Sequence, residues 1–160
     1  MAKTKFTAEP GKQEIVMTRV FDAPPQKVFE ALIRPELVAR WWGGSLYETT
    51  IDKLDARPGG MWRFVQKDRQ GNYHNFRGVF HEVAFPERII QTFEYENLPE
   101  PGHVLLETIK LVEENGKTRM IDQSVFQSVG DRDGMLQAGM EKGANASLDA
   151  LEALVVKARK

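Results

Sequence analysis

The chain has 160 residues, and its 22 Lys and Arg residues nearly balance 23 Asp and Glu residues, which leaves a formal net charge of −1. This balance provides no overall attraction to nucleic acid or to an anionic membrane. The absence of cysteine excludes disulfides, thiolate metal sites and cysteine nucleophiles. The start of the chain lacks the apolar stretch of a signal peptide. We therefore expect one cytoplasmic domain with neither nucleic acid nor membrane as a partner.

The first elements are marked by clear start signals. Residues 1–11 are polar and predict a flexible lead-in, followed by a single domain over residues 12–160. The β-prone run 14–21 predicts the first strand, and Asp22, followed by two prolines, is an N-cap signal for a short helix. Pro35 interrupts the helical spacing that follows, so a second short helix is expected from there to about Trp42.

A meander of six antiparallel strands is expected between Gly44 and residue 127, where strand-like runs alternate with turn signals rich in Gly, Pro and Asn. The pair Asn115–Gly116 is the sharpest of these signals, because both residues tolerate the positive φ of a tight turn. It predicts a hairpin between strands near 103–113 and 118–127. With the first strand, the sheet should have about seven strands.

A long C-terminal helix is expected over residues 131–157, which contain no proline and keep a helical spacing of apolar residues. The order of elements lacks βαβ alternation and predicts an α+β fold, in which a curved antiparallel sheet wraps around this helix. Such an arrangement leaves an internal apolar cavity. Gly139 and Gly143 are four residues apart, so we expect them on the inner helix face, where either a ligand or the sheet comes close.

The cavity should be lined by aromatic and methionine side chains that alternate along the strands, together with the helix glycines. Any one aromatic or methionine residue in such a pattern is more often ordinary core, and only the set argues for a cavity. The predicted ligand-binding residues are Trp41, Trp42, Trp62, Phe64, Phe76, Phe80, Met120, Met135, Gly139, Met140 and Gly143.

Four polar strand residues are candidates for acid–base chemistry if they face inward, namely Arg63, His74, Glu94 and Asp122. Strand alternation places about half of such side chains on the outer face. Glu107 is expected to form a surface ion pair with Lys117 or Arg119 across the hairpin.

No catalytic residue, metal site or cofactor is predicted from motifs. The three histidines, His74, His81 and His103, lack the spacing of metal ligands. The chain contains neither a GxSxG nucleophile turn nor a glycine-rich phosphate loop.

Several segments resemble motifs of one family, the heat-shock-protein-90 ATPase-activator homologue-like family. Its opening is similar to residues 19–24 (RVFDAP), 28–32 (VFEAL) and 35–43 (PELVARWWG). Its later motifs resemble residues 55–60, 77–80, 86–89 and 135–143. The family is placed in the START-like, or SRPBCC, superfamily of helix-grip folds. The resemblance therefore implies a deep hydrophobic cavity between the sheet and the C-terminal helix.

The superfamily includes lipid and hormone carriers, polyketide cyclases and chaperone cofactors, so the resemblance leaves several functions open. The leading hypothesis is non-enzymatic binding of a small hydrophobic, aromatic or lipid-like molecule. One alternative is a cyclase- or dehydratase-like enzyme that uses the same cavity. The other is an interaction module whose partner is a chaperone or another protein. Both a monomer and a homodimer agree with the sequence.

Overall fold

The computed structural model describes residues 4–157 and contains one antiparallel sheet of eight strands in the order β1-β2-β8-β7-β6-β5-β4-β3. The strands are β1 (Lys5–Thr7), β2 (Glu14–Phe21), β3 (Tyr47–Leu54), β4 (Met61–Asp68), β5 (Tyr73–Ala84), β6 (Arg88–Tyr95), β7 (Val104–Glu114) and β8 (Lys117–Val125). The helices are α1 (Pro25–Ile33), α2 (Pro35–Trp41), the 3-10 turn η1 (Gly44–Leu46), α3 (Val129–Gln137) and α4 (Met140–Lys157).

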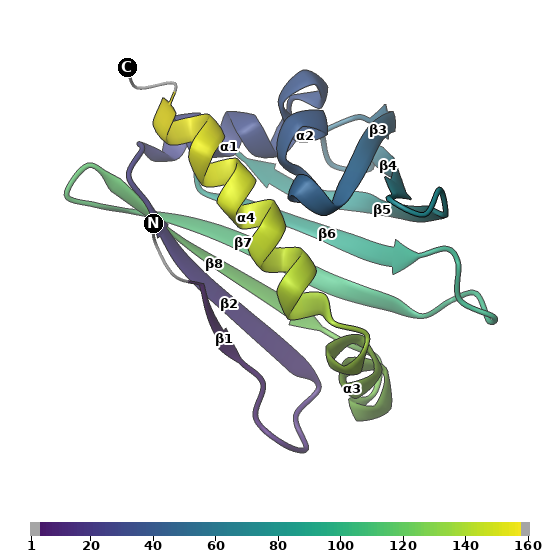
Figure 1. The fold of residues 1–160 in the computed structure, drawn as a ribbon. Helices are drawn as coiled ribbons and strands as arrows, with labels where there is room; N and C mark the ends of the chain where they lie inside the picture. The colour runs from purple at the N-terminus through teal and green to yellow at the C-terminus, as the bar shows by residue number, and fades with distance from the viewer. Residues whose placement is uncertain (1–3, 158–160) are drawn as a thin grey trace.

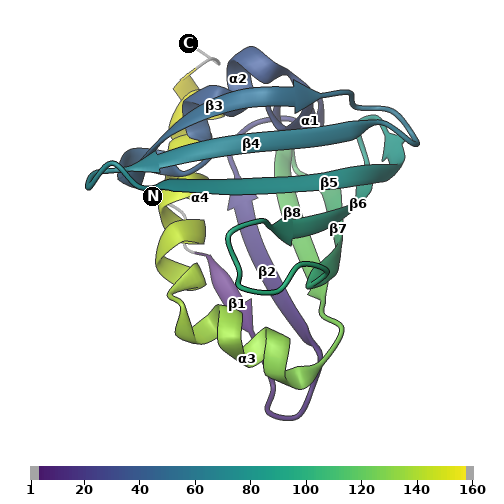
Figure 2. The same cartoon turned by 90° about the vertical axis from the view of Figure 1, so that its right-hand side faces the viewer.

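The sheet curls around α4, which crosses its concave side (Figure 1). In the orthogonal view, β3, β4 and β5 run in a very different direction from β2 and β8, because the sheet turns steadily from one edge to the other (Figure 2). This arrangement confirms the predicted α+β helix-grip fold, with eight strands in place of about seven.

The additional strand is β1, which lies within the predicted flexible lead-in. Its residues Lys5–Thr7 pair antiparallel with Val16–Thr18 of β2 and form an edge of the sheet. Three residues are too short a run for a period-2 pattern, so the sequence carried no signal for this strand. Residues 1–3 of the lead-in and residues 158–160 of the predicted domain lie outside the described residues.

The start of α1 differs from the prediction in one respect. The N-cap is Pro24, which has extended backbone angles and no side-chain cap, and Pro25 is the first helical residue. The N-cap position is therefore two residues later than the predicted Asp22, because the two prolines fix the backbone at the entry into the first turn.

The six strands β3–β8 form the predicted meander, and each predicted turn connects two of them. The hairpin at Asn115 and Gly116 is confirmed, with φ of 54° and 78° at these two residues. It pairs Glu114 with Lys117 and fixes the register of β7 against β8.

The C-terminal segment forms two helices where one was predicted. Gly139 has a φ of 86°, a left-handed conformation that ends α3 and lets the chain turn before α4 begins at Met140. The Ser128 hydroxyl accepts a hydrogen bond from the Asp131 backbone N–H (3.0 Å) and caps the start of α3. Helical spacing continues across the break from Leu136 to Met140, which is why the sequence pattern hid it.

The buried apolar side chains form two clusters. The larger one fills the space between the sheet, α1, α2 and the C-terminal part of α4, and includes Phe21, Phe29 and Leu151. The smaller one consists of Ile15, Leu105 and Phe126, against which side chains of α3 and the start of α4 pack. Phe93 of β6 packs against both clusters.

Candidate functional site

An aromatic cluster occupies the concave face around Trp42, which follows α2. The ring centroid of Trp42 lies 4.9 Å from Phe76, 5.0 Å from Phe64, and 6.4 Å from both Trp62 and Phe93. Most of these contacts are edge-to-face, the geometry that aromatic quadrupoles favour. The strand residues converge because they alternate with outward-facing residues on β4, β5 and β6.

The remaining apolar candidates occupy two different environments. Phe80 and Met120 are buried in the larger cluster, as is Trp41, whose indole Nε1 donates to the Ala31 carbonyl oxygen (2.7 Å) and links α2 to α1. Met135 and Met140 are partly buried and pack on the smaller cluster. A ligand-binding role for these residues stays a prediction.

Gly139 and Gly143 do not mark a close approach of the sheet, and a ligand-binding role for them stays a prediction. No atom outside the local chain lies within 4 Å of the position that a Cβ would take at either residue. Gly139 is exposed and terminates a helix, so the two glycines do not share one helix face. The space beside Gly143 is open.

The close approach of α4 occurs instead at Gly43 and Gly44, to which the sequence assigned no role beyond the start of the strand region. A Cβ on Gly44 would lie 2.3 Å from the Ala146 carbonyl oxygen. The Gly43 backbone N–H donates to the Ser147 hydroxyl (2.8 Å). Two consecutive glycines after two tryptophans were the available signal, since only glycine lets two backbones come this close.

A polar band crosses the concave face between the two core clusters. Glu107 lies opposite Gln91 on one neighbouring strand and Ser124 on the other. Buried side chains lie two residues from each of the three on its own strand, so all three face inward, yet each keeps part of its surface accessible. Met17 and Phe93, which also face inward, are likewise only partly buried. We call Met17, Gln91, Phe93, Glu107 and Ser124 the interior band.

A pair of carboxyl groups lies in this region. Asp122 is 5% exposed and is the diagonal neighbour of Glu107 across the β7–β8 ladder. Burial first, and then the charge of Glu107 and a hydrogen bond to it, raise the pKa of Asp122 well above its ordinary value. Two carboxyl groups can share a hydrogen bond only when one of them holds a proton. The Gln91 amide donates to Glu107 Oε1 (2.8 Å) and fixes that side chain.

One oxygen of this pair, Asp122 Oδ1, is buried and has no hydrogen-bond partner. Three other buried side-chain atoms of the described residues are also unpartnered: Arg19 Nε, Trp62 Nε1 and Asn75 Oδ1. Unpaired groups of this kind carry a desolvation penalty that a ligand can relieve.

The predicted surface ion pair of Glu107 is wrong. The two-residue turn at Asn115 and Gly116 places Glu107 opposite Ser124, and Arg119 pairs with Glu114 instead (2.9 Å). The alternation along β7, with Leu105 and Ile109 buried on either side of Glu107, turns its side chain inward.

Two of the four polar candidates lie on the outer face. Glu94 pairs with Arg77 (3.0 Å), and Arg63 pairs with Glu96 (2.9 Å). A hydrogen bond from the Gly102 backbone N–H lowers the pKa of Glu94, and Arg77 adds to this effect. These groups are surface ion pairs, so of the four only His74 and Asp122 face the interior.

His74 belongs to a second polar group at the far end of the concave face. Its Nε2 donates to Asp68 Oδ2 (2.9 Å), and its Nδ1 lies 2.7 Å from the Tyr95 hydroxyl. The hydrogen bond from His74 lowers the pKa of Asp68, whereas burial raises the pKa of Tyr95. Phe93 lies between Tyr95 and Gln91 on the same face of β6, and so separates this group from the carboxyl pair.

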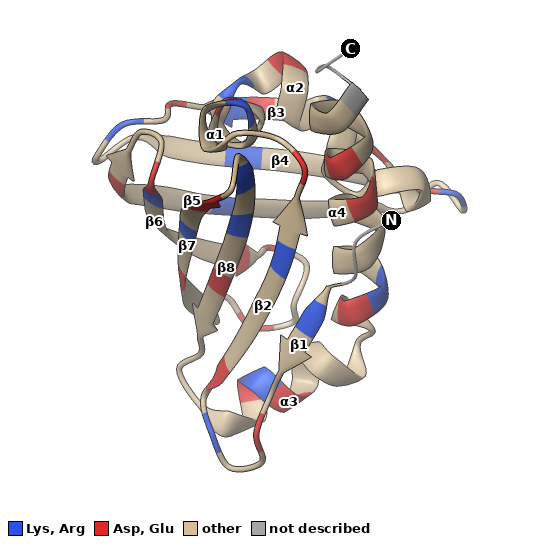
Figure 3. Ribbon diagram, turned by 90° about the vertical axis from the view of Figure 1, so that its left-hand side faces the viewer, with Lys and Arg blue, Asp and Glu red and all other residues tan. Residues whose placement is uncertain are grey.

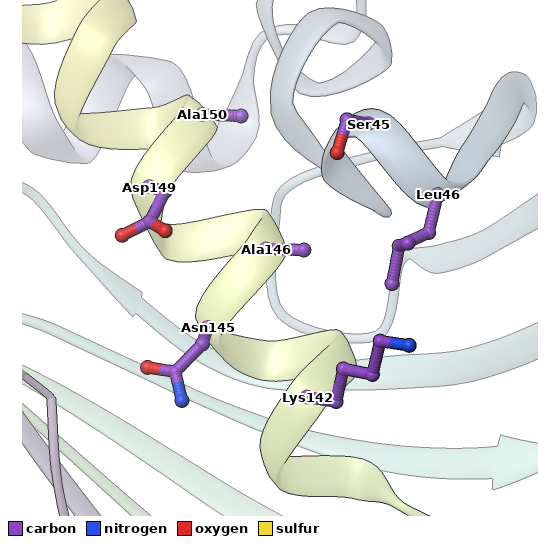
Figure 4. Close-up of a pocket in the computed structure, with 7 residues that line it drawn as sticks. All are labelled: Ser45, Leu46, Lys142, Asn145, Ala146, Asp149 and Ala150. Atoms are coloured by element: carbon purple, nitrogen blue, oxygen red, sulfur yellow. The ribbon is translucent and has the colours of Figure 1, made fainter.

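A hollow of about 510 Å³ lies between α4 and η1. Ala146 and Ala150 of α4 face Leu46 and Ser45 across it, whereas Asn145 and Asp149 point away (Figure 4). It is open to solvent and differs from the enclosed cavity that the sequence predicted.

Residues 4–157 contain no group of three or more His, Cys, Asp or Glu side chains arranged to hold a metal ion. Within the same residues, no helix is both long and apolar enough to cross a membrane. Basic and acidic residues are interspersed over β1, β2, β7 and β8, with no face of one sign in this view (Figure 3).

The fold has many structural relatives. Protein Ms6760 from Mycobacterium smegmatis superposes with a TM-score of 0.87 at 19% identity, over 97% of both chains. A protein from Arthrobacter aurescens gives 0.87 at 20% identity, covering 96% of this chain and 91% of its own. Protein CV1439 from Chromobacterium violaceum is 27% identical with a TM-score of 0.74, covering 89% of this chain and 96% of its own.

None of the curated proteins matches the chain. The family model described as "Activator of Hsp90 ATPase homolog 1-like protein" matches residues 22–156, from the end of β2 into the last turn of α4. The chain therefore belongs to the Activator of Hsp90 ATPase homolog 1-like family.

Proposed function

We propose that the protein binds a small, largely apolar molecule at the interior band, between the two core clusters and beneath α4. The observation that carries this proposal is the incomplete burial of five side chains that face inward, Met17, Gln91, Phe93, Glu107 and Ser124. A sheet that only packed a core would bury these positions, as it does at Ile15, Leu105 and Ile109 on the same strands.

The surroundings suit a ligand with an aromatic or aliphatic body. Trp42, Phe76 and Phe93 present ring surfaces beside the band, and each is only partly buried. Contact with such rings removes apolar area from water, worth roughly 25 cal/mol per Å². Gln91 and Glu107 add the few polar groups that orient a ligand in a mostly apolar site.

The proposal is tested by filling the band. Ser124→Leu adds bulk at an inward-facing position, and Val125→Leu adds a similar group at the adjacent outward-facing position of β8. Binding of a panel of hydrophobic aromatic molecules is followed by quenching of tryptophan fluorescence, because Trp42 and Trp62 lie at the site. We expect saturable binding by the wild type and by Val125→Leu.

Ser124→Leu should weaken that binding by about tenfold or more, since the added side chain occupies the same space. Undiminished binding by Ser124→Leu, or no binding by the wild type of any panel member, would overturn the proposal. Melting curves of both variants establish that each is folded.

A second candidate function is acid–base catalysis on a bound cyclic substrate, and it is favoured by Asp122. The raised pKa of this buried carboxyl group favours its protonated form, and a protonated carboxyl group can act as a general acid. The same panel separates the two functions, because an enzyme would release chemically altered molecules whereas a carrier returns them unchanged.

A further inference from the structure

The carboxyl pair in the interior has no counter-ion. Arg19 is the inward-facing cation on the strand next to Asp122, but its guanidinium already pairs with Asp149 (2.8 Å) and Glu152 (2.9 Å) on α4. The other buried cation, Arg132, donates to Asp133 (2.8 Å) and to the Glu9 carbonyl oxygen. Neither cation pairs with Glu107 or Asp122.

Trp62 holds another buried polar atom without a partner, outside the carboxyl pair. Its ring extends from β4 across Gly78 of β5, where a Cβ would lie 2.4 Å from Nε1, and its centroid lies 5.7 Å from that of Phe93 on β6. The unpaired Nε1–H therefore lies over β5, two strands from Glu107, in a side chain that is 1% exposed. This donor needs an acceptor and does not bear on a group that binds the two carboxyl groups.

We propose that Glu107 and Asp122 bind the protonated amino group of a ligand whose remaining body is aromatic or aliphatic. This inference rests on the proposed function and specifies the chemical class of the ligand. An ammonium group has three N–H donors and no acceptor, which complements two carboxyl groups and the free acceptor atom of Asp122. It also brings the positive charge that the carboxyl pair lacks.

Other ligand classes fit these residues less well. A carboxylate or phosphate would meet like charge at Glu107, without a free cation on the described concave face to offset it. An alcohol offers only one donor to the two carboxyl groups. Both a quaternary and a primary ammonium group can lie against the ring face of Phe93. A quaternary group has no N–H to donate to the unpaired oxygen of Asp122, whereas a primary ammonium group has three.

The test uses three probes with the same naphthyl ring and different charge: naphthylethylamine, naphthylethanol and naphthylacetate. Binding to the wild type is measured by fluorescence titration at about pH 8, where an alkyl amine with a pKa near that of lysine is still protonated. We expect the amine to bind about tenfold more tightly than the alcohol, and naphthylacetate to bind more weakly than both.

The variants Glu107→Gln, which removes the negative charge, and Asp122→Leu, which removes the acceptor oxygen, should abolish most of this preference, by lowering amine affinity about tenfold while leaving alcohol affinity nearly unchanged. Glu94→Gln, which removes an outward-facing carboxyl group on β6, is the matched control and should keep the full preference. The Ser124→Leu variant should lose all three probes.

The outcomes separate this inference from the function on which it rests. If the alcohol binds as tightly as the amine and Glu107→Gln changes neither affinity, the band binds apolar molecules and the amine specificity is wrong. If no probe binds and the wider hydrophobic panel also fails, both proposals fall. A preference for the amine that Glu94→Gln weakens as much as Glu107→Gln would also contradict the inference.

Discussion

The two regions of the concave face follow the same strand alternation and yet differ in how completely they are covered. Near α1, the side chains of Phe21, Phe29 and Leu151 are each 0% exposed. At the interior band, Met17 and Glu107 face the same interior and keep accessible surface. The first region is closed by α1, α2 and the C-terminal part of α4, whereas the second is covered by α3 and the first turns of α4.

The composition of α4 explains part of this difference. Its C-terminal turns contribute Leu148, Leu151 and Val155, all buried in the larger cluster. Its first turns carry small residues, among them Gly143 and Ala144, which are only partly buried. One helix thus closes the core at one end and leaves space at the other, which separates the part of the fold that stabilises it from the part that we propose binds a ligand.

The largest effect should come from truncating a side chain at the closed end. Leu151→Ala removes a fully buried side chain from a close-packed cluster and should lower the free energy of unfolding by about 3 kcal/mol. Met140→Ala, at the open end, removes a partly buried and adaptable side chain and should cost less than about 1 kcal/mol. Urea denaturation of both variants measures the contrast, and equal losses would show that the two regions are packed alike.

The second effect depends on pH and concerns Asp122. Its pKa in the folded protein lies above the value in the unfolded chain, mainly because of burial. The unfolded state therefore loses its proton first as the pH rises above about 4, and folding stability falls from there until the folded-state pKa is passed. Asp122→Asn keeps a hydrogen-bond donor for Glu107 and removes this titration.

We expect Asp122→Asn to melt at a higher temperature than the wild type at about pH 8, with a gain that shrinks towards about pH 4. Thermal unfolding monitored by circular dichroism across this range gives the comparison. A gain that is constant with pH, or one that grows as the pH falls, would mean that Asp122 does not hold its proton in the folded state.

The sequence predicted those parts of the fold that depend on local patterns. Alternation was sufficient to place Trp62, Phe64 and Phe76 on one face, and the Asn115–Gly116 turn was sufficient to fix the β7–β8 register. The same register places Glu107 opposite Ser124 on the inner face. Because its side chain is charged, Glu107 was expected on the solvent face. Which face of a strand is buried depends on what covers it, and charge is a weak guide where a polar site is built inside.

The interior band could not be predicted, because it depends on the path of the C-terminal segment. A single straight helix over residues 131–157 would have presented the same face to the sheet along its whole length. The chain changes direction between α3 and α4, at the break at Gly139 (Figure 2). Side chains of α3 and Met140 pack on the smaller cluster, and the later turns of α4 pack on the larger one. A positive φ at one residue leaves no trace in the spacing of apolar residues.

The smallest effect contrasts the two glycines that the sequence analysis placed together. Gly139→Ala puts a side chain on a residue with a φ of 86° and should cost about 1 kcal/mol, since a left-handed conformation is strained for alanine. Gly143→Ala lies inside α4, where no atom would touch the added methyl group, and should gain up to about 1 kcal/mol from helix propensity.

Chemical denaturation of these two variants tests the helix break directly. Opposite signs support two helices with a turn at Gly139, because only the residue at the turn needs a positive φ. A gain in both variants would instead indicate a continuous helix with both glycines in its interior. A continuous helix would place the small residues at the start of α4 over the whole interior band. The helix break could then not explain why the side chain of Glu107 keeps accessible surface.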